Sequence, residues 1–163
     1  PEPSQASGEP RQPAPLLLSF HGQYGDARAY AGDRRFAEIG REHGLVVASP
    51  QGMDDGPLGA GWNVGSAADD TTCTRGVVAD ETACYRSCAH LDACGRCNWS
   101  TCYDDRLFTA AILRALFEEF CIDESRVYLE GASNGGMFAQ YLVHEMPGTF
   151  AGLAAVFASP LLG

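Results

Sequence analysis

Short apolar runs alternate with amphipathic stretches along this chain, and that alternation limits the possible folds more than any other feature. Strands are expected at 16–20, 45–48, 126–130 and 152–158, and helices at 28–43, 104–120 and 134–146. Alternation of this kind requires parallel strands joined by right-handed crossovers, with helices on both faces of the sheet. The sequence therefore predicts an α/β fold with three layers and a mostly parallel sheet.

Each expected helix has an apolar face that should pack on the sheet. The residues expected to face the core are Tyr30, Phe36 and Ile39 in the first helix, Phe108, Ile112, Ala115 and Leu116 in the second, and Phe138, Leu142 and Met146 in the third. Gly44 stands where a helix C-terminus favours glycine. Two acids, Asp104 and Asp105, open the second helix at its positive end.

The chain of 163 residues is long enough for one domain, and its 45% hydrophobic content favours a globular fold. Residues 1–14 are rich in Pro, Ser, Gln and Glu and are expected to form a disordered tail or linker. Residues 15–163 are expected to form the domain. Residues 51–103 have no clear period, and a segment of this length inside a domain is typical of a functional or separately cross-linked insert, placed here at about 66–103.

The formal net charge of −10 argues against binding to nucleic acid or to an anionic membrane surface, since both attract basic patches. No apolar run approaches the roughly 20 residues of a membrane span. The chain also opens without the features of a signal peptide, as a mature or trimmed chain would.

Six of the seven cysteines lie close together: Cys73, Cys84, Cys88, Cys94, Cys97 and Cys102. An even cluster in a short polar segment favours disulfides and an oxidising compartment, so we expect secretion. The alternative is a zinc site, because Cys84-x3-Cys88 and Cys94-x2-Cys97 have tolerable spacing and His90 is nearby. Cys121 is expected to be a buried thiol or the partner of a cysteine beyond this chain.

Gly131-Ala132-Ser133-Asn134-Gly135 matches the G-x-S-x-G nucleophile elbow, and it lies between an expected strand and an expected helix. Such a turn exposes the serine hydroxyl beside a helix N-terminus. There the Asn134 backbone N–H can hold a developing oxyanion. The alternative is an ordinary strand-to-helix turn whose serine caps the helix.

The loop after the first strand is the expected source of the second oxyanion N–H. Gln23 is the favoured donor, with Gly22 and Tyr24 as alternatives. His21 is not expected to be the catalytic base. Trp62 either lines the substrate pocket or is a core residue beneath its loop; both interpretations stay open.

Three stretches resemble the polyhydroxybutyrate depolymerase and feruloyl esterase group of the α/β-hydrolase superfamily: 17–22 (LLSFHG), 61–63 (GWN) and 122–137 (IDESRVYLEGASNGGM). Residues 99–105 (WSTCYDD) are also similar to secreted eukaryotic members with a cysteine-rich insert. The resemblance covers roughly residues 15–160.

This resemblance implies a secreted carboxylic ester hydrolase with no metal and no organic cofactor. Its substrate would be an ester that is polymeric or hydroxycinnamoyl. Ser133 would attack the ester carbonyl, a histidine would carry the proton to the leaving alcohol, and an aspartate would orient that histidine.

The sequence departs from this pattern after the nucleophile, where the fold orders its triad as serine, acid, histidine. Only His144 and Glu145 follow as candidates, with no aspartate. His144 would lie about 16 Å from Ser133 along the helix, at 1.5 Å rise per residue. We therefore expect a domain incomplete at both ends, as a fragment or a degenerate copy. A non-catalytic secreted binding module is the alternative function, and a zinc-binding domain at 73–102 a third.

Overall fold

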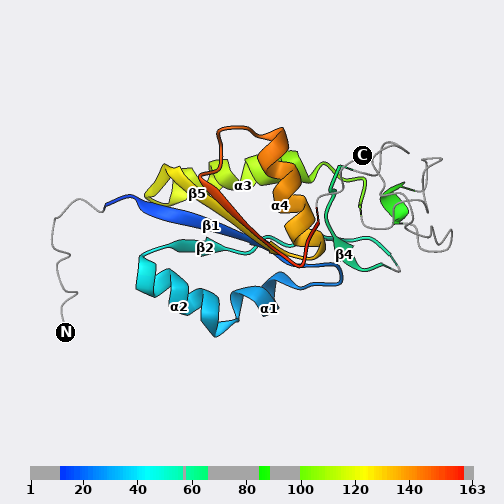
Figure 1. Ribbon diagram of the computed structural model, residues 1–163, viewed down its shortest axis with the longest axis horizontal. Helices are drawn as coiled ribbons and strands as arrows, with labels where there is room; N and C mark the ends of the chain where they lie inside the picture. The colour runs from blue at the N-terminus through cyan, green and yellow to red at the C-terminus, as the bar shows by residue number, and fades with distance from the viewer. Residues whose placement is uncertain (1–11, 57, 66–84, 89–99, 160–163) are drawn as a thin grey trace.

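The computed structural model describes residues 12–56, 58–65, 85–88 and 100–159. Its main sheet has four parallel strands in the order β2-β1-β5-β6, as Figure 1 shows. They are β1 (Ala14–Phe20), β2 (Val46–Ala48), β5 (Ile122–Ala132) and β6 (Gly152–Val156). The expected parallel sheet is confirmed, and β1 begins at Ala14, within the segment expected to be a tail.

Helices cover both faces of this sheet. One face carries α1 (Ala27–Ala31) and α2 (Arg34–His43), and the other carries α3 (Asp105–Glu119) and α4 (Asn134–Glu145), as Figure 1 shows. The three expected layers are therefore present. Between α2 and α3 lie a small antiparallel pair, β3 (Met53–Asp54) and β4 (Ala60–Gly61), and the 3-10 turn η1 (Arg86–Cys88). None of the described helices is long and apolar enough to cross a bilayer.

The core lies between the two central strands and α4. In the β1–β5 register, Leu16 pairs with Val127 and Leu18 with Leu129, and all four side chains are at most 1% exposed. The buried face of α4 packs on this pair through Phe138 and Leu142, while Met146 is partly buried. The expected core face of this helix is therefore confirmed.

The single helix expected over 28–43 is instead two helices. Asp33 interrupts it, because its carboxylate accepts the backbone N–H of Arg35 and so caps a new helix. Tyr30 and Phe36 are partly buried and stack across the break, with ring centroids 5.9 Å apart. Ile39 was expected in the core but is exposed. Gly44 ends α2 with a φ of 64°, as its position predicted.

The helix expected over 104–120, α3, is rotated about its axis from the expected orientation. Phe108 and Ala115 are exposed, whereas Thr109 and Leu113 are buried, and only the partial burial of Ile112 and Leu116 was foreseen. Buried positions recur at four-residue steps from Asp105, whose side chain is itself buried. The polar anchor at the start of α3 therefore sets its orientation, and hydrophobicity counts do not register such an anchor.

Gly135 is the tightest contact between α4 and the sheet. A Cβ at this position would overlap the carbonyl oxygens of Phe20 and His21. We expect Gly135→Ala to lower the free energy of unfolding by about 1–3 kcal/mol, the usual cost of overpacking. Urea denaturation would measure it. At Gly40 a Cβ would come no closer than 3.2 Å to any atom, so Gly40→Ala is the control and should change stability much less.

Candidate active site

Ser133 has the backbone geometry of a nucleophile elbow. Its φ of 51° and ψ of −122° are strained for a residue with a side chain. The turn is fixed from both sides, since the Ser133 N–H donates to the Val156 carbonyl at 2.9 Å and the Ser133 carbonyl accepts the Met137 N–H at 3.0 Å. The Ser133 side chain makes no capping hydrogen bond to α4. The helix-cap alternative therefore does not describe this serine.

Glycines allow the segments around Ser133 to approach one another. A Cβ at Gly131 would overlap the Gly135 backbone. A Cβ at Gly22 would lie 3.2 Å from the Ala132 oxygen and 3.4 Å from the Ser133 Cβ. The loop after β1 therefore lies directly against Ser133, where the sequence predicts an oxyanion donor.

The three candidate donors in this loop are in different positions. The Tyr24 N–H donates to the Ala60 carbonyl at 2.8 Å and is therefore already used. The Gln23 side chain donates to the Tyr85 hydroxyl at 3.1 Å. No hydrogen bond from the Gln23 backbone N–H to a described residue is present. Gln23 and Gly22 therefore remain as candidate donors of the second oxyanion N–H.

Asn134 follows Ser133 and is the first residue of α4, so its N–H is one of the first four N–H groups of the helix, which have no acceptor within the helix itself. Its side chain is fully buried and its Oδ1 accepts the Trp62 N–H at 2.8 Å. Sequence reasoning assigned a role only to the Asn134 backbone. The only sequence signal for a role of the side chain was that residue 134 is an asparagine, because a buried amide needs a hydrogen-bond partner.

Trp62 is a core residue in this structure. It is 0% exposed, stacks on Phe138 with ring centroids 5.1 Å apart, and donates from Nε1 to the His21 carbonyl at 2.8 Å. Of the two interpretations left open for Trp62, this burial supports the core one. Together with Asn134, it joins the end of β1 to the elbow.

His21 is a structural residue. Its ring is fully buried, its Nδ1 lies 2.7 Å from the Gly22 carbonyl, and its Nε2 accepts the Gly52 N–H at 2.9 Å. These partners require the neutral ring with the proton on Nδ1. Burial also lowers the pKa of His21, which favours the same neutral ring. The expectation that His21 is not the base is therefore supported.

The described residues bring no acid–base pair to Ser133. The side chain of His144 is 86% exposed and pairs with Glu145 at 3.0 Å, near the far end of α4. The Glu130 carboxylate accepts the Ser19 hydroxyl at 2.6 Å. His43 is exposed at the end of α2, and His90 lies outside the described residues.

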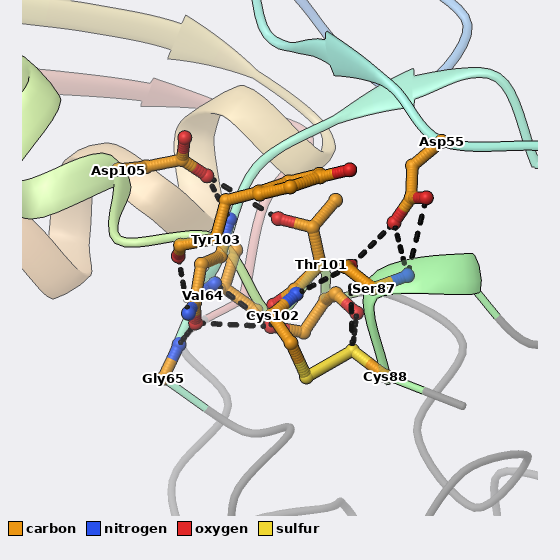
Figure 2. The surroundings of a disulfide bond; sticks show 11 residues. Asp55, Val64, Gly65, Ser87, Cys88, Thr101, Cys102, Tyr103 and Asp105 are labelled. Atoms are coloured by element: carbon orange, nitrogen blue, oxygen red, sulfur yellow. Dashed lines mark hydrogen bonds between the residues drawn. A yellow bond between two sulfur atoms is a disulfide. The ribbon is translucent and has the colours of Figure 1, made fainter. Parts of the chain in front are cut away.

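A disulfide joins Cys88 to Cys102, as Figure 2 shows. The Ser87 hydroxyl beside it donates to the Asp55 carboxylate and accepts the Cys102 N–H at 2.9 Å. The Cys88 thiolate is thus not available to a zinc ion, which favours disulfides in the insert. Cys73, Cys84, Cys94 and Cys97 lie outside the described residues. Cys121 is exposed, not buried as one expectation had it.

The cross-linked segment holds the loop that contains Trp62. The Val64 N–H donates to the Ser100 hydroxyl at 3.0 Å, and the Thr101 N–H donates to the Trp62 carbonyl at 3.2 Å. The Asp105 carboxylate accepts the Asn63 N–H at 2.7 Å (Figure 2 shows this side chain above the disulfide). Burial raises the pKa of Asp105 to about 6.

Comparisons by sequence and by structure find proteins that are similar to this chain. The prolyl oligopeptidase family matches residues 86–159. Feruloyl esterase B of Piromyces equi is 26% identical over 139 residues, which cover 85% of this chain and 19% of that protein. Among solved structures, an acetyl xylan esterase from Aspergillus awamori has a TM-score of 0.58 at 18% identity, over 91% of this chain and 43% of that one. An S-formylglutathione hydrolase from Agrobacterium tumefaciens has a TM-score of 0.54 at 16% identity, over 88% and 47%.

These structural matches show the α/β-hydrolase fold. Together with the sequence match, they confirm the expected resemblance to esterases of this superfamily, a feruloyl esterase among them. The chain spans about a fifth of the length of the feruloyl esterase and less than half of each of these two solved structures.

Asp105 should make stability depend on pH. Its pKa of about 6 in the folded chain exceeds its ordinary value of 3.8, so the folded state binds more protons between these values. The contribution of Asp105 to the free energy of unfolding is therefore fully present below pH 4. This contribution, up to about 3 kcal/mol, is lost as the pH rises through 6. Urea denaturation between pH 4 and 7.5 should show wild type losing stability relative to Asp105→Asn. Parallel pH curves for the two proteins would contradict this.

The Cys88–Cys102 bond should be directly detectable. Digestion without reductant should release a peptide pair cross-linked through these residues. The free energy of unfolding of the Cys88→Ser/Cys102→Ser variant should be lower by about 3 kcal/mol, the value for a disulfide that closes a loop near 15 residues. Cys121→Ser is the matched single-thiol control and should have little effect. Alkylation of Cys88 in the unreduced protein, together with bound zinc, would instead support the metal interpretation.

Proposed function

We propose that this chain is part of a serine hydrolase of carboxylic esters, with Ser133 as the nucleophile. The observation that carries the proposal is the conformation of Ser133, which has a φ of 51° between β5 and α4 and no capping role. Strain at such a position is retained where it exposes a reactive group. The names of the relatives, esterases and a hydrolase, support the same class.

In the proposed reaction the Ser133 oxygen forms a bond to the ester carbonyl carbon. The negative charge that develops on the carbonyl oxygen is held by the Asn134 N–H, with the Gln23 N–H as second donor. Collapse expels the alcohol, which takes the serine proton by way of a base, and leaves an acyl-enzyme that water hydrolyses. Because no described residue supplies that base, the proposal assigns proton transfer to a histidine and an acid outside the described residues.

We infer a substrate of hydroxycinnamate or hydroxyalkanoate type, free or in a polymer. The relative named feruloyl esterase supports the first class. The initial resemblance to polyhydroxybutyrate depolymerases supports the second. The disulfide supports secretion, since such bonds persist in oxidising compartments.

A non-catalytic binding module is the second candidate function. It is favoured because neither described histidine near β1 or α4 can serve as the base of Ser133. His21 is neutral and hydrogen-bonded at both ring nitrogens, and His144 is exposed near the far end of α4. On this alternative Ser133 would have no greater reactivity than other serines.

Reactivity of Ser133 separates the two candidates. In the whole protein that contains this chain, a fluorophosphonate probe should label Ser133, and Ser133→Ala should abolish labelling. Ser125→Ala is the matched control, because Ser125 is an exposed serine hydrogen-bonded to the Asp123 carboxylate, and labelling should be unchanged.

The 163-residue chain should hydrolyse p-nitrophenyl acetate barely above background, and His21→Ala should not reduce that rate. A serine without a base is a weak nucleophile at neutral pH. Labelling of the whole protein that persists in Ser133→Ala would sink the hydrolase assignment. Robust turnover by the chain that vanished in His21→Ala would overturn the role given to His21.

A further inference from the structure

A tyrosine from the cysteine-rich insert reaches the loop that follows β1. Tyr85 is 1% exposed, and its hydroxyl accepts a hydrogen bond from Gln23 Nε2 at 3.1 Å, although the two residues are 62 positions apart in the chain. Gln23 is the residue whose backbone N–H is favoured as the second oxyanion donor. The contact therefore joins the insert to a group that the proposed reaction needs beside Ser133.

The direction of the Gln23 N–H is set by the peptide to which it belongs. The Gly22 carbonyl of that peptide accepts the Gly25 N–H at 2.9 Å and lies 2.7 Å from His21 Nδ1. Because this peptide is trans and planar, the Gln23 N–H points away from those two groups. Its direction is thus fixed on the carbonyl side, and the Gln23 side chain can fix the residue on the other side.

Tyr85 is anchored by the turn that follows it. The Tyr85 carbonyl accepts the Cys88 N–H at 3.0 Å, and Cys88 forms the disulfide with Cys102. Between these residues, the Ser87 N–H donates to the buried Asp55 carboxylate at 3.0 Å, as Figure 2 shows. The disulfide and this hydrogen bond together hold η1, and η1 holds the backbone of Tyr85.

The Tyr85 hydroxyl lies where the insert meets β4 and the start of α4. A Cβ at Gly61 would overlap this hydroxyl and would lie 3.3 Å from Asn134 Oδ1. Burial raises the pKa of Tyr85 to about 12, so the hydroxyl stays protonated at neutral pH. Its contact with Gln23 therefore does not change with pH in the range where esterases are assayed.

We propose that Tyr85 is a positioning residue for the proposed ester hydrolysis, because it holds Gln23 so that the Gln23 N–H can bind the oxyanion formed at Ser133. The inference rests on the proposed function and gives the insert a part in it. Oxyanion donors are effective when they are preorganised, since a donor in place needs no reorganisation during the reaction. A loosely held Gln23 would slow the reaction while still allowing the substrate to bind.

The alternative is that Tyr85 only fills the core of the insert. Burial of the ring would be served equally well by phenylalanine, which has no hydroxyl to press against Gly61. A buried hydroxyl costs free energy unless it is hydrogen-bonded, and this one accepts its bond from a residue of another segment, Gln23. The hydroxyl, more than the ring, therefore supports a positioning role.

The test uses the whole protein that contains this chain, with p-nitrophenyl acetate as the substrate. Tyr85→Phe removes only the hydroxyl. Gln23→Met removes the side-chain amide but keeps the backbone N–H and a similar length, and a double variant combines the two changes. Tyr103→Phe is the matched control, because Tyr103 follows Cys102 of the same disulfide. The measurements are kcat, KM and the final extent of fluorophosphonate labelling at Ser133.

We expect Tyr85→Phe and Gln23→Met each to lower kcat about tenfold, a part of the effect of removing an oxyanion donor, with KM changed less than about twofold. The double variant should be no slower than the slower single variant, because both changes break the same contact. The final extent of labelling should stay unchanged, which separates a displaced donor from a misfolded protein. Tyr103→Phe should match wild type.

Unchanged kcat in either single variant, a rise in KM alone, or losses that multiply in the double variant would overturn the inference. If Tyr85→Phe also lowers the final extent of labelling, the Gln23→Met result decides. A wild-type protein that the probe does not label at Ser133 would refute the proposed function and this inference with it. A labelled wild type whose kcat neither substitution changes would refute this inference alone.

Discussion

The contact between the first turn of α4 and the end of β1 determines the rest of this site. Gly135 packs so closely on the Phe20 and His21 carbonyls that any side chain there would collide with them. A helix this close to the sheet leaves a very short turn after β5, and Ser133 takes a left-handed conformation to make it. The strained conformation of Ser133 is therefore a consequence of close backbone packing.

A second set of contacts fixes the loops around this elbow. The buried Asn134 amide binds the Trp62 backbone, Trp62 binds the His21 carbonyl, and Thr101 binds the Trp62 carbonyl. Buried polar groups must find partners, so each link constrains the next. The cysteine-rich insert thereby contributes to the site through the loop it holds, although its disulfide does not contact Ser133.

Features with a local cause could be predicted from the sequence, and features set by distant partners could not. The apolar run at 16–20, the elbow and the buried face of α4 are local patterns and were found. The Asp33 cap was visible in principle, but the continuous apolar spacing hid it. The orientation of α3 could not be read, because it depends on Asp105 bonding to Asn63, a residue 42 positions away. The interpretation of Trp62 depended in the same way on partners in other segments.

The pairing of β1 with β5 has a consequence for how this chain reaches its fold. Ser19 and Glu130 meet across that pair although they are 111 residues apart in the chain. Closing such a loop precedes any gain from the core, so folding should be slow for a domain of this size. The Cys88–Cys102 disulfide shortens this loop only slightly, because the two cysteines are 14 residues apart. The entropic cost of closing the loop varies only with the logarithm of its length, so folding stays slow. During synthesis β1 can pair with β2, but its other edge stays open until β5 emerges, and chaperone binding to residues 14–20 would protect that apolar edge over the interval.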